Sequence, residues 1–282
     1  MTGRFAIVTD GSVTLPANFL KEQQLAIAHD HISFGMDSFT PNVDLADEKY
    51  YELIRTRKEH PSTSQPSLGD IRDAYEAALA YAKDVLVITV DATRSGTFGT
   101  MSTAAQAMGG RFEMVDSRSV SGGLGLMVMA AARARQQGCS LDEAAASVRK
   151  MAQKINLIAY IDTLEFLKKS GRVSAVQALV GSILSVRPLL RFAGGEPVIL
   201  DRIRTRSRGL ARLREVVASD VGEGSRAQVF VLHTNSPADA RELGAWARRT
   251  FHCVEYFEQE AGPVLATHVG PGVVALAFVK ED

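Results

Sequence analysis

The chain of 282 residues carries 32 Lys and Arg against 32 Asp and Glu, so its formal net charge is zero. Nucleic acids and anionic membrane surfaces both attract a surplus of basic residues, so we expect neither as the main partner. Hydrophobic residues make up 46% of the chain, which excludes a disordered protein and suits one large α/β unit or two domains.

In the first half, short apolar runs alternate with longer amphipathic segments. We expect strands at 5–9, 26–34, 85–90 and 112–115, and helices at 16–23, 46–58, 67–82, 97–108, 123–137 and 140–154. Ser67 with Asp70, and Ser140 with Glu143, have the spacing of a capping box at a helix N-terminus. Strands that alternate with helices of this length predict a parallel sheet covered by helices, in a domain over residues 1–155.

The second half has strands in closer succession. We expect strands at 157–161, 189–192, 198–203, 229–233, 254–257 and 273–279, and helices at 164–169, 175–186, 207–217 and 236–249. Residues 193–197 have the composition of a hairpin turn. The predicted fold class is therefore α/β, with a parallel-sheet N-terminal domain and a smaller α+β domain over residues 156–282.

The two cysteines, Cys139 and Cys253, form no disulfide framework and no metal-ligand spacing. The longest apolar uncharged stretches, 119–132 and 173–186, are shorter than the ~20 residues that span a bilayer. The first ten residues do not resemble a secretory signal, because Asp10 follows only five mostly apolar residues. We expect a cytoplasmic protein with no transmembrane segment that handles a small molecule or a protein partner.

The sequence lacks the common signatures of nucleotide-binding loops, zinc proteases and serine hydrolases. The run from Gly122 to Gly125 opens a predicted helix, but its spacing fits a dinucleotide-binding turn poorly. It indicates instead a helix that packs closely against its neighbours. We expect no catalytic residue, no metal and no cofactor of the protein's own.

Hydroxyl groups follow the predicted strands of the first half. Ser12 follows the first strand, Ser95 and Thr97 follow the third, and Ser117 follows the fourth. The carboxyl ends of parallel strands meet at one edge of the sheet, where ligands bind. Each hydroxyl can simply cap a helix, or the clusters can together hold an anion such as a carboxylate or a phosphate.

Motifs along the whole chain resemble those of the DegV family. They are Ile7-Val-Thr-Asp10 with Leu15-Pro16, Thr63-Ser-Gln-Pro-Ser67, Ser95-Gly-Thr97, Val115-Asp-Ser117 with Gly123-Leu-Gly125, Leu164-Glu-Phe-Leu-Lys-Lys169 with Gly171-Arg172, and Gly262-Pro-Val with Thr267-His-Val-Gly-Pro-Gly272. The resemblance implies a two-domain protein that binds a long-chain fatty acid between its domains. It also implies that the protein presents the carboxylate to a separate ATP-using fatty acid kinase subunit.

The resemblance assigns the carboxylate to Thr63 and Ser95, with Ser64, Gly96 and Thr97 as weaker candidates nearby. Neutral donors at the start of a helix hold a carboxylate without burying an opposite charge.

Two further residues are candidates for the head-group site. The resemblance implies Arg172, which can equally form a surface or interdomain ion pair. His268 stands among glycines in an expected loop, where it can bond the ligand or serve only the loop. Helix 175–186 and residues 124–129 can line the hydrocarbon tail, or belong to the plain core.

Arg204 is matched to a Lys/Arg-Thr element through which the family is thought to dock on its kinase. It lies in the densest basic cluster of the chain, which is otherwise read as a solvated face and consists of Arg202, Arg204, Arg206, Arg208 and Arg212. Two positions depart from the family pattern: Gly11 intervenes in the usual Thr-Asp-Ser after the first strand, and Arg94 stands where an apolar residue is usual. The alternative function is a stand-alone hydrolase or phosphotransferase that uses the region of Asp10, Ser95 and His268.

Overall fold

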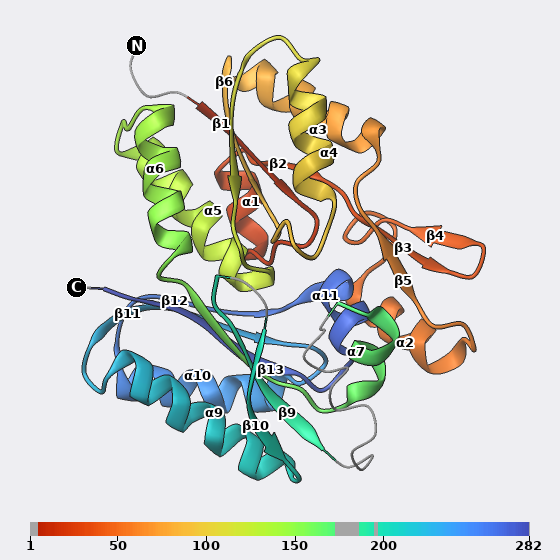
Figure 1. Cartoon of the computed structure of the whole chain (residues 1–282), viewed down its shortest axis with the longest axis vertical. Coiled ribbons are helices and arrows are strands. Elements are labelled where there is room, and N and C mark those ends of the chain that lie inside the picture. Colours follow the sequence, from red (N-terminus) through yellow and green to blue (C-terminus); the bar gives the residue numbers. More distant parts are fainter. Residues whose placement is uncertain (1–4, 173–185, 195–196, 282) are drawn as a thin grey trace.

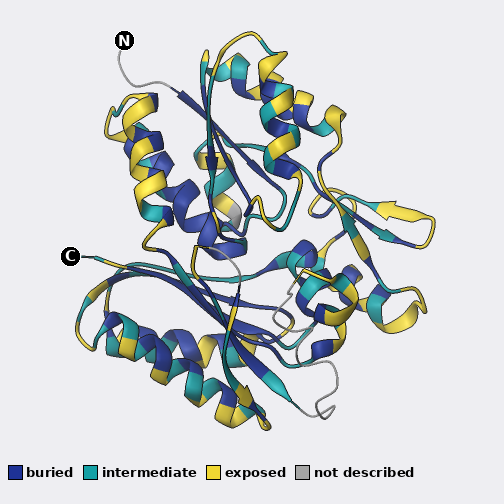
Figure 2. Ribbon diagram, in the orientation of Figure 1, coloured by how far each residue is buried: buried dark blue, intermediate teal, exposed yellow. Residues whose placement is uncertain are grey.

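In a computed structural model of the chain, residues 5–172, 186–194 and 197–281 are described, and they form three β-sheets with helices packed around them (Figure 1). The first sheet is parallel throughout, in the order β2-β1-β6-β7. Its strands are β1 (Phe5–Asp10), β2 (Ala26–Ala28), β6 (Asp84–Thr89) and β7 (Arg111–Asp116). Every residue of β1 is buried, as its dark blue colour in Figure 2 shows.

Helices cover both faces of this parallel sheet. One face packs on α3 (Leu68–Tyr81) and α4 (Thr97–Gln106), and the other on α5 (Ser121–Gln136) and α6 (Leu141–Ala152). A short helix, α1 (Ala17–Glu22), follows β1. The predicted capping boxes at Ser67 and Ser140 are both confirmed. The α/β fold class is therefore confirmed, since the sheet is parallel and covered as expected.

The second sheet is mixed and has the order β10-β9-β8-β13-β11-β12. Its strands are β8 (Asn156–Tyr160), β9 (Arg187–Phe192), β10 (Val198–Ile203), β11 (Arg226–His233), β12 (His252–Glu260) and β13 (Val274–Lys280). One face packs on α9 (Arg206–Val221) and α10 (Pro237–Thr250). β9 and β10 form the expected antiparallel pair.

Helix α5 joins the two large sheets, because one hydrophobic core contains residues of α5, of the parallel sheet and of the mixed sheet (Figure 1). Its glycines allow this close packing. A Cβ atom on Gly122 would lie 2.7 Å from Leu232 Cδ1, and one on Gly125 would lie 2.1 Å from the carbonyl oxygen of Thr14. The prediction that the glycine run serves close helix packing is confirmed.

The third sheet is small and was not predicted. It has the order β4-β3-β5, from β3 (His31–Phe34), β4 (Asp37–Phe39) and β5 (Ser62–Ser64). Together with α2 (Asp47–Thr56) it packs on α11 (Gly262–Val269), so an early segment of the chain shares a core with a late one. Helix α11 also contacts α7 (Leu164–Ser170).

Two sequence-based expectations are wrong. The single strand expected at 26–34 is two strands in different sheets, because the chain leaves the parallel sheet at His29 and Asp30. His268 was expected in a loop but lies in α11, which Gly270 ends with a positive φ of 78°. The expected helix 175–186 falls almost entirely outside the described residues, and the division at residue 155 stays a prediction. In the described ranges, no helix is long and apolar enough to span a membrane.

Replacing Gly125 with alanine should destabilise the protein by about 1–3 kcal/mol, because the new methyl group collides with backbone between the two sheets. Gly99→Ala in α4 is the matched control, since no atom lies within 4 Å of its Cβ position. That change should be neutral or stabilise the protein by up to ~1 kcal/mol. Urea unfolding measures both, and equal stabilities of the two variants would contradict the packing role of α5.

Candidate functional site

A cavity of about 220 Å³ lies between the carboxyl edge of the parallel sheet and the mixed sheet. Its apolar wall comes mainly from the mixed sheet and includes Leu157, Ala159, Ile161, Phe192, Leu232 and Ala275. Leu157 and Ala159 face the cavity because strand residues alternate sides, while Ile158 and Tyr160 pack in the core on the opposite face. The mixed sheet therefore supplies a continuous apolar surface to the site.

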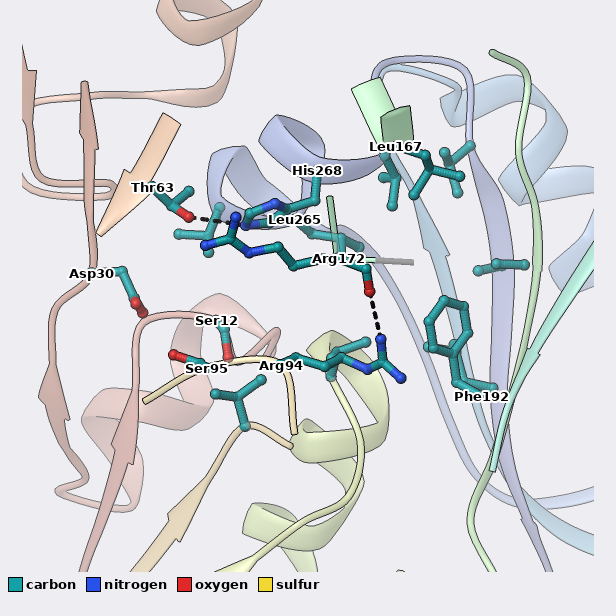
Figure 3. Close-up of a pocket in the computed structure, with 18 of the residues that line it drawn as sticks. Ser12, Asp30, Thr63, Arg94, Ser95, Leu167, Arg172, Phe192, Leu265 and His268 are labelled. Carbon is teal, nitrogen blue, oxygen red and sulfur yellow. Dashed lines mark hydrogen bonds between the residues drawn. The ribbon is translucent and has the colours of Figure 1, made fainter. Parts of the chain in front are cut away.

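Polar side chains gather at the other end of the cavity. Figure 3 shows Ser12, Asp30, Thr63 and Ser95 on one side, with Phe192 on the opposite side. The polar groups come from loops after β1 and β6 and from the small third sheet. The cavity is thus polar at one end and apolar at the other, which is the shape of site that an amphipathic ligand requires.

The buried carboxylate of Asp10 fixes two of these loops. One oxygen accepts hydrogen bonds from the backbone N–H of Ser12 at 3.0 Å and from the Ser12 hydroxyl, and the other accepts one from the N–H of Val90 at 2.7 Å. Val90 begins the loop that carries Arg94 and Ser95. Burial raises the pKa of Asp10, and these donors offset part of that effect.

Ser95 stands at the start of α4. Its hydroxyl lies 2.7 Å from the Thr97 hydroxyl and accepts a hydrogen bond from the Thr97 N–H at 3.2 Å. Thr97 itself is buried and does not line the cavity, so its predicted role rests on sequence alone. Gly96 allows Gln65 to approach, since a Cβ atom there would lie 2.5 Å from Gln65 Oε1. The free N–H groups and partial positive charge of a helix start favour an anion at this place.

Thr63 and His268 meet across the site. The Thr63 hydroxyl lies 3.0 Å from Nε2 of His268, while Nδ1 of His268 is buried and has no partner among the described residues. Burial, together with the positive charge of Arg172 and the nearby His60, lowers the pKa of His268 to about 4. His268 is therefore neutral near pH 7, with one ring nitrogen able to donate and the other able to accept.

Two arginines line the cavity, Arg94 between Ser95 and Phe192 and Arg172 on the side of His268 (Figure 3). Arg94 pairs with Asp91 at 3.1 Å and donates a hydrogen bond to the backbone oxygen of Arg172 at 2.7 Å. Its guanidinium also lies 5.7 Å from the centre of the Phe192 ring. Arg94 thus links the loop after β6 to the segment after α7 and to β9. Arg172 is exposed and lines the cavity.

The structure brings together Thr63, Ser95, Gly96, Arg172 and His268 around the cavity. Ser64 is exposed and does not line the cavity, because neighbouring residues of β5 face opposite sides. Its predicted role rests on sequence alone.

Arg204 is exposed in the turn between β10 and α9. Within its cluster, Arg206 pairs with Asp239 at 2.6 Å and Arg212 pairs with Glu215 at 2.9 Å. The basic surface around Arg204 is therefore smaller than the sequence indicates.

Sequence reasoning did not place Asp30 or Gln65 at the site, and it noted Ser12 only as one of several hydroxyls. The signal for Ser12 was its position after β1. Asp30 carried a weaker signal, a charged residue between His29 and His31 inside an expected strand. Within the described ranges, no group of three or more His, Cys, Asp or Glu residues is arranged to hold a metal ion.

The fold and the cavity define an α/β protein with an apolar site that ends in hydroxyl, imidazole and guanidinium groups. A family model described as "Uncharacterised protein, DegV family" matches residues 4–281. A DegV domain-containing protein of Deinococcus radiodurans is 33% identical over 273 residues, 97% of each chain. The chain belongs to the DegV family.

Solved structures of this family share the fold over nearly the whole chain. A fatty-acid-binding DegV family protein from Thermus thermophilus has a TM-score of 0.90 at 25% identity and covers 99% of this chain and 100% of its own. DegV of Bacillus subtilis, a fatty acid binding protein, has a TM-score of 0.87 at 26% identity and covers 98% of this chain and 99% of its own.

His268→Gln should reduce the acid sensitivity of the protein. The pKa of His268 is about 4 in the folded state and ~6.5 when unfolded, so the unfolded state takes up the proton first as the pH falls. Wild-type stability is then lost between these two values, by at most roughly 3 kcal/mol. Urea unfolding from about pH 7 to about pH 4 should show a smaller loss in the variant. His252→Gln, at an exposed residue, is the control and should behave as wild type.

Proposed function

We propose that the protein binds a long-chain fatty acid in this cavity, with the carboxylate at the polar end and the hydrocarbon tail along the mixed sheet. One observation carries the proposal: a single cavity has apolar side chains at one end and convergent polar groups at the other. The fatty-acid-binding relatives from Thermus thermophilus and Bacillus subtilis support it, since their chains match this one from end to end.

The head group would lie among neutral donors. Thr63, Ser95 and His268 offer hydroxyl and imidazole groups, and Gly96 keeps the start of α4 open to the ligand. Arg172 adds a positive charge at the rim without being buried. A hydrogen bond to a charged acceptor contributes about 1.5–3 kcal/mol, so these groups orient the ligand and select a carboxylate.

The tail would supply most of the affinity. Each buried CH2 group contributes about 0.8 kcal/mol, so a tail of more than a dozen carbons contributes roughly 10 kcal/mol before the costs of ordering it. The side chains of Leu157, Ala159 and Phe192 form no hydrogen bonds, so they can contact any hydrocarbon tail. The shape of this apolar wall would therefore determine which chain lengths fit.

We further propose that the protein is a carrier that presents the carboxylate to a separate ATP-dependent fatty acid kinase subunit, with ATP bound only by that partner. The exposed Arg204 is the proposed contact. A stand-alone hydrolase is less favoured, because a serine nucleophile needs a base on its hydroxyl. The Ser95 hydroxyl lies beside that of Thr97, and His268 lies beside Thr63.

Protein purified from cells should carry a fatty acid of ~14–18 carbons, released by denaturing extraction and identified by mass spectrometry.

Thr63→Val removes the hydroxyl and should weaken fatty-acid binding by about 10- to 100-fold, the equivalent of one hydrogen bond to a charged acceptor. Ser62→Ala is the matched control, because Ser62 is exposed on the opposite face of the same strand. A lipid-free protein that rejects added fatty acid would refute the proposal.

Arg204→Glu should slow acyl-phosphate formation when the loaded protein is mixed with a fatty acid kinase subunit and ATP. Reversing one charge at a docking surface typically lowers the association rate by about tenfold and leaves fatty-acid binding unchanged. Arg241→Glu, at an exposed residue of α10, is the control. Equal rates for both variants would exclude Arg204 from the interface.

A further inference from the structure

Asp30 lies at a boundary between two cavities. It lines the cavity described above and also a second cavity of about 390 Å³, bounded by residues near α1 and by Asp47 and Glu260. It occupies the short link between β2 and β3, where the chain leaves the parallel sheet. Figure 3 shows its carboxyl group on the same side of the site as Ser12 and Ser95.

The carboxyl group of Asp30 is buried without a full set of partners. The residue is 7% exposed, and its Oδ2 atom has no hydrogen-bond partner among the residues that the structure describes. Buried polar atoms in native proteins are almost always bonded, so this carboxyl group has hydrogen-bonding capacity that the described residues leave unused. Because Asp30 lines the cavity, a ligand there is a candidate partner for the carboxyl group.

Gly11 makes room for Asp30. A Cβ atom on Gly11 would lie 2.8 Å from the backbone nitrogen of Asp30 and 3.0 Å from its Oδ2 atom. Any side chain at position 11 would therefore displace Asp30, so the glycine at this position is what allows Asp30 to occupy its place.

The charged groups around Asp30 favour its protonated form. Burial and the negative charges of Asp10 and Asp70 raise the pKa of Asp30 well above its usual value. Asp10 is the ionised member of the close pair, because its oxygens accept from Ser12 and Val90 N–H groups that can only donate. On the α3 side, His31 is bonded to Asp70 at 2.8 Å.

The remaining titratable and charged neighbours lie farther out. Burial lowers the pKa of the adjacent His29, which favours its neutral form. Asp47 and Glu260 face Asp30 across the second cavity, while Arg94, Arg172 and His268 line the first. In the first cavity, a ligand carboxylate would therefore meet a carboxyl group that holds its own proton.

We propose that Asp30 is a further head-group residue, which donates a hydrogen bond from its carboxyl group to the carboxylate of the bound fatty acid. The inference rests on the proposed function. Its consequence is a pH dependence with a definite sign: the fatty acid binds while Asp30 holds its proton, and binding weakens as rising pH removes that proton and leaves two facing negative charges. Asp30 thereby selects for a ligand that accepts hydrogen bonds at its polar end.

The test measures hexadecanoate affinity by isothermal titration calorimetry from about pH 6 to about pH 9. Wild-type affinity should fall by about tenfold or more over this range, while Asp30→Asn, which keeps a donor but cannot ionise, should bind with little pH dependence. Asp30→Ala should bind about tenfold more weakly than Asp30→Asn at every pH, since it has no donor. Asp73→Asn, at an exposed residue of α3, should follow wild type.

A second measurement uses the wild-type protein alone. In buffers of different ionisation enthalpy, hexadecanoate binding near the upper end of this range should take up close to one proton. Because an anion also raises the pKa of His268, the uptake is repeated in His268→Gln, where it should persist. Absence of uptake, or the same pH profile in Asp30→Asn as in wild type, would overturn the role of Asp30. A wild-type protein that binds no hexadecanoate at any pH would overturn the proposed function as well.

Discussion

The carboxylate of Asp10 is the constraint on which the site depends. It is buried at the end of β1, and it bonds the first turn after its own strand and the first residue after β6. These bonds hold the loops that carry Ser12 and Ser95 in one arrangement, at the edge where the parallel strands end. A buried charge with several donors is costly to disturb, so the polar end of the cavity is set before any ligand arrives.

The apolar end depends on a different kind of contact. Helix α5 brings the parallel sheet and the mixed sheet close enough for β8 and β13 to face the polar loops, and it does so through glycines that leave no room for a side chain. Arg94 then ties the two ends together, through its bond to the Arg172 backbone and its contact with the Phe192 ring. One cation thus links the two ends of the cavity by contacts between distant segments of the chain.

The sequence was sufficient where a residue's role depends on its near neighbours. Capping boxes, the parallel sheet and the hydroxyls after its strands all follow from spacing along a few residues. It was not sufficient where contacts link distant segments. Strands as short as β5 show no periodicity, and the glycines that end α11 resemble loop residues. The place of Asp30 depends on its contacts with Gly11 and Asp10, which are distant from it in the sequence. The site is therefore less visible in the sequence than the fold that carries it.

The cavity takes its two ends from different sheets, so whatever fills it touches both. A molecule that binds only the native chain shifts the folding equilibrium by mass action, and the shift grows with its concentration over its dissociation constant. The unfilled protein is then the least stable folded form and the form most exposed to proteases. Cellular abundance of the protein would then rise and fall with the supply of its ligand.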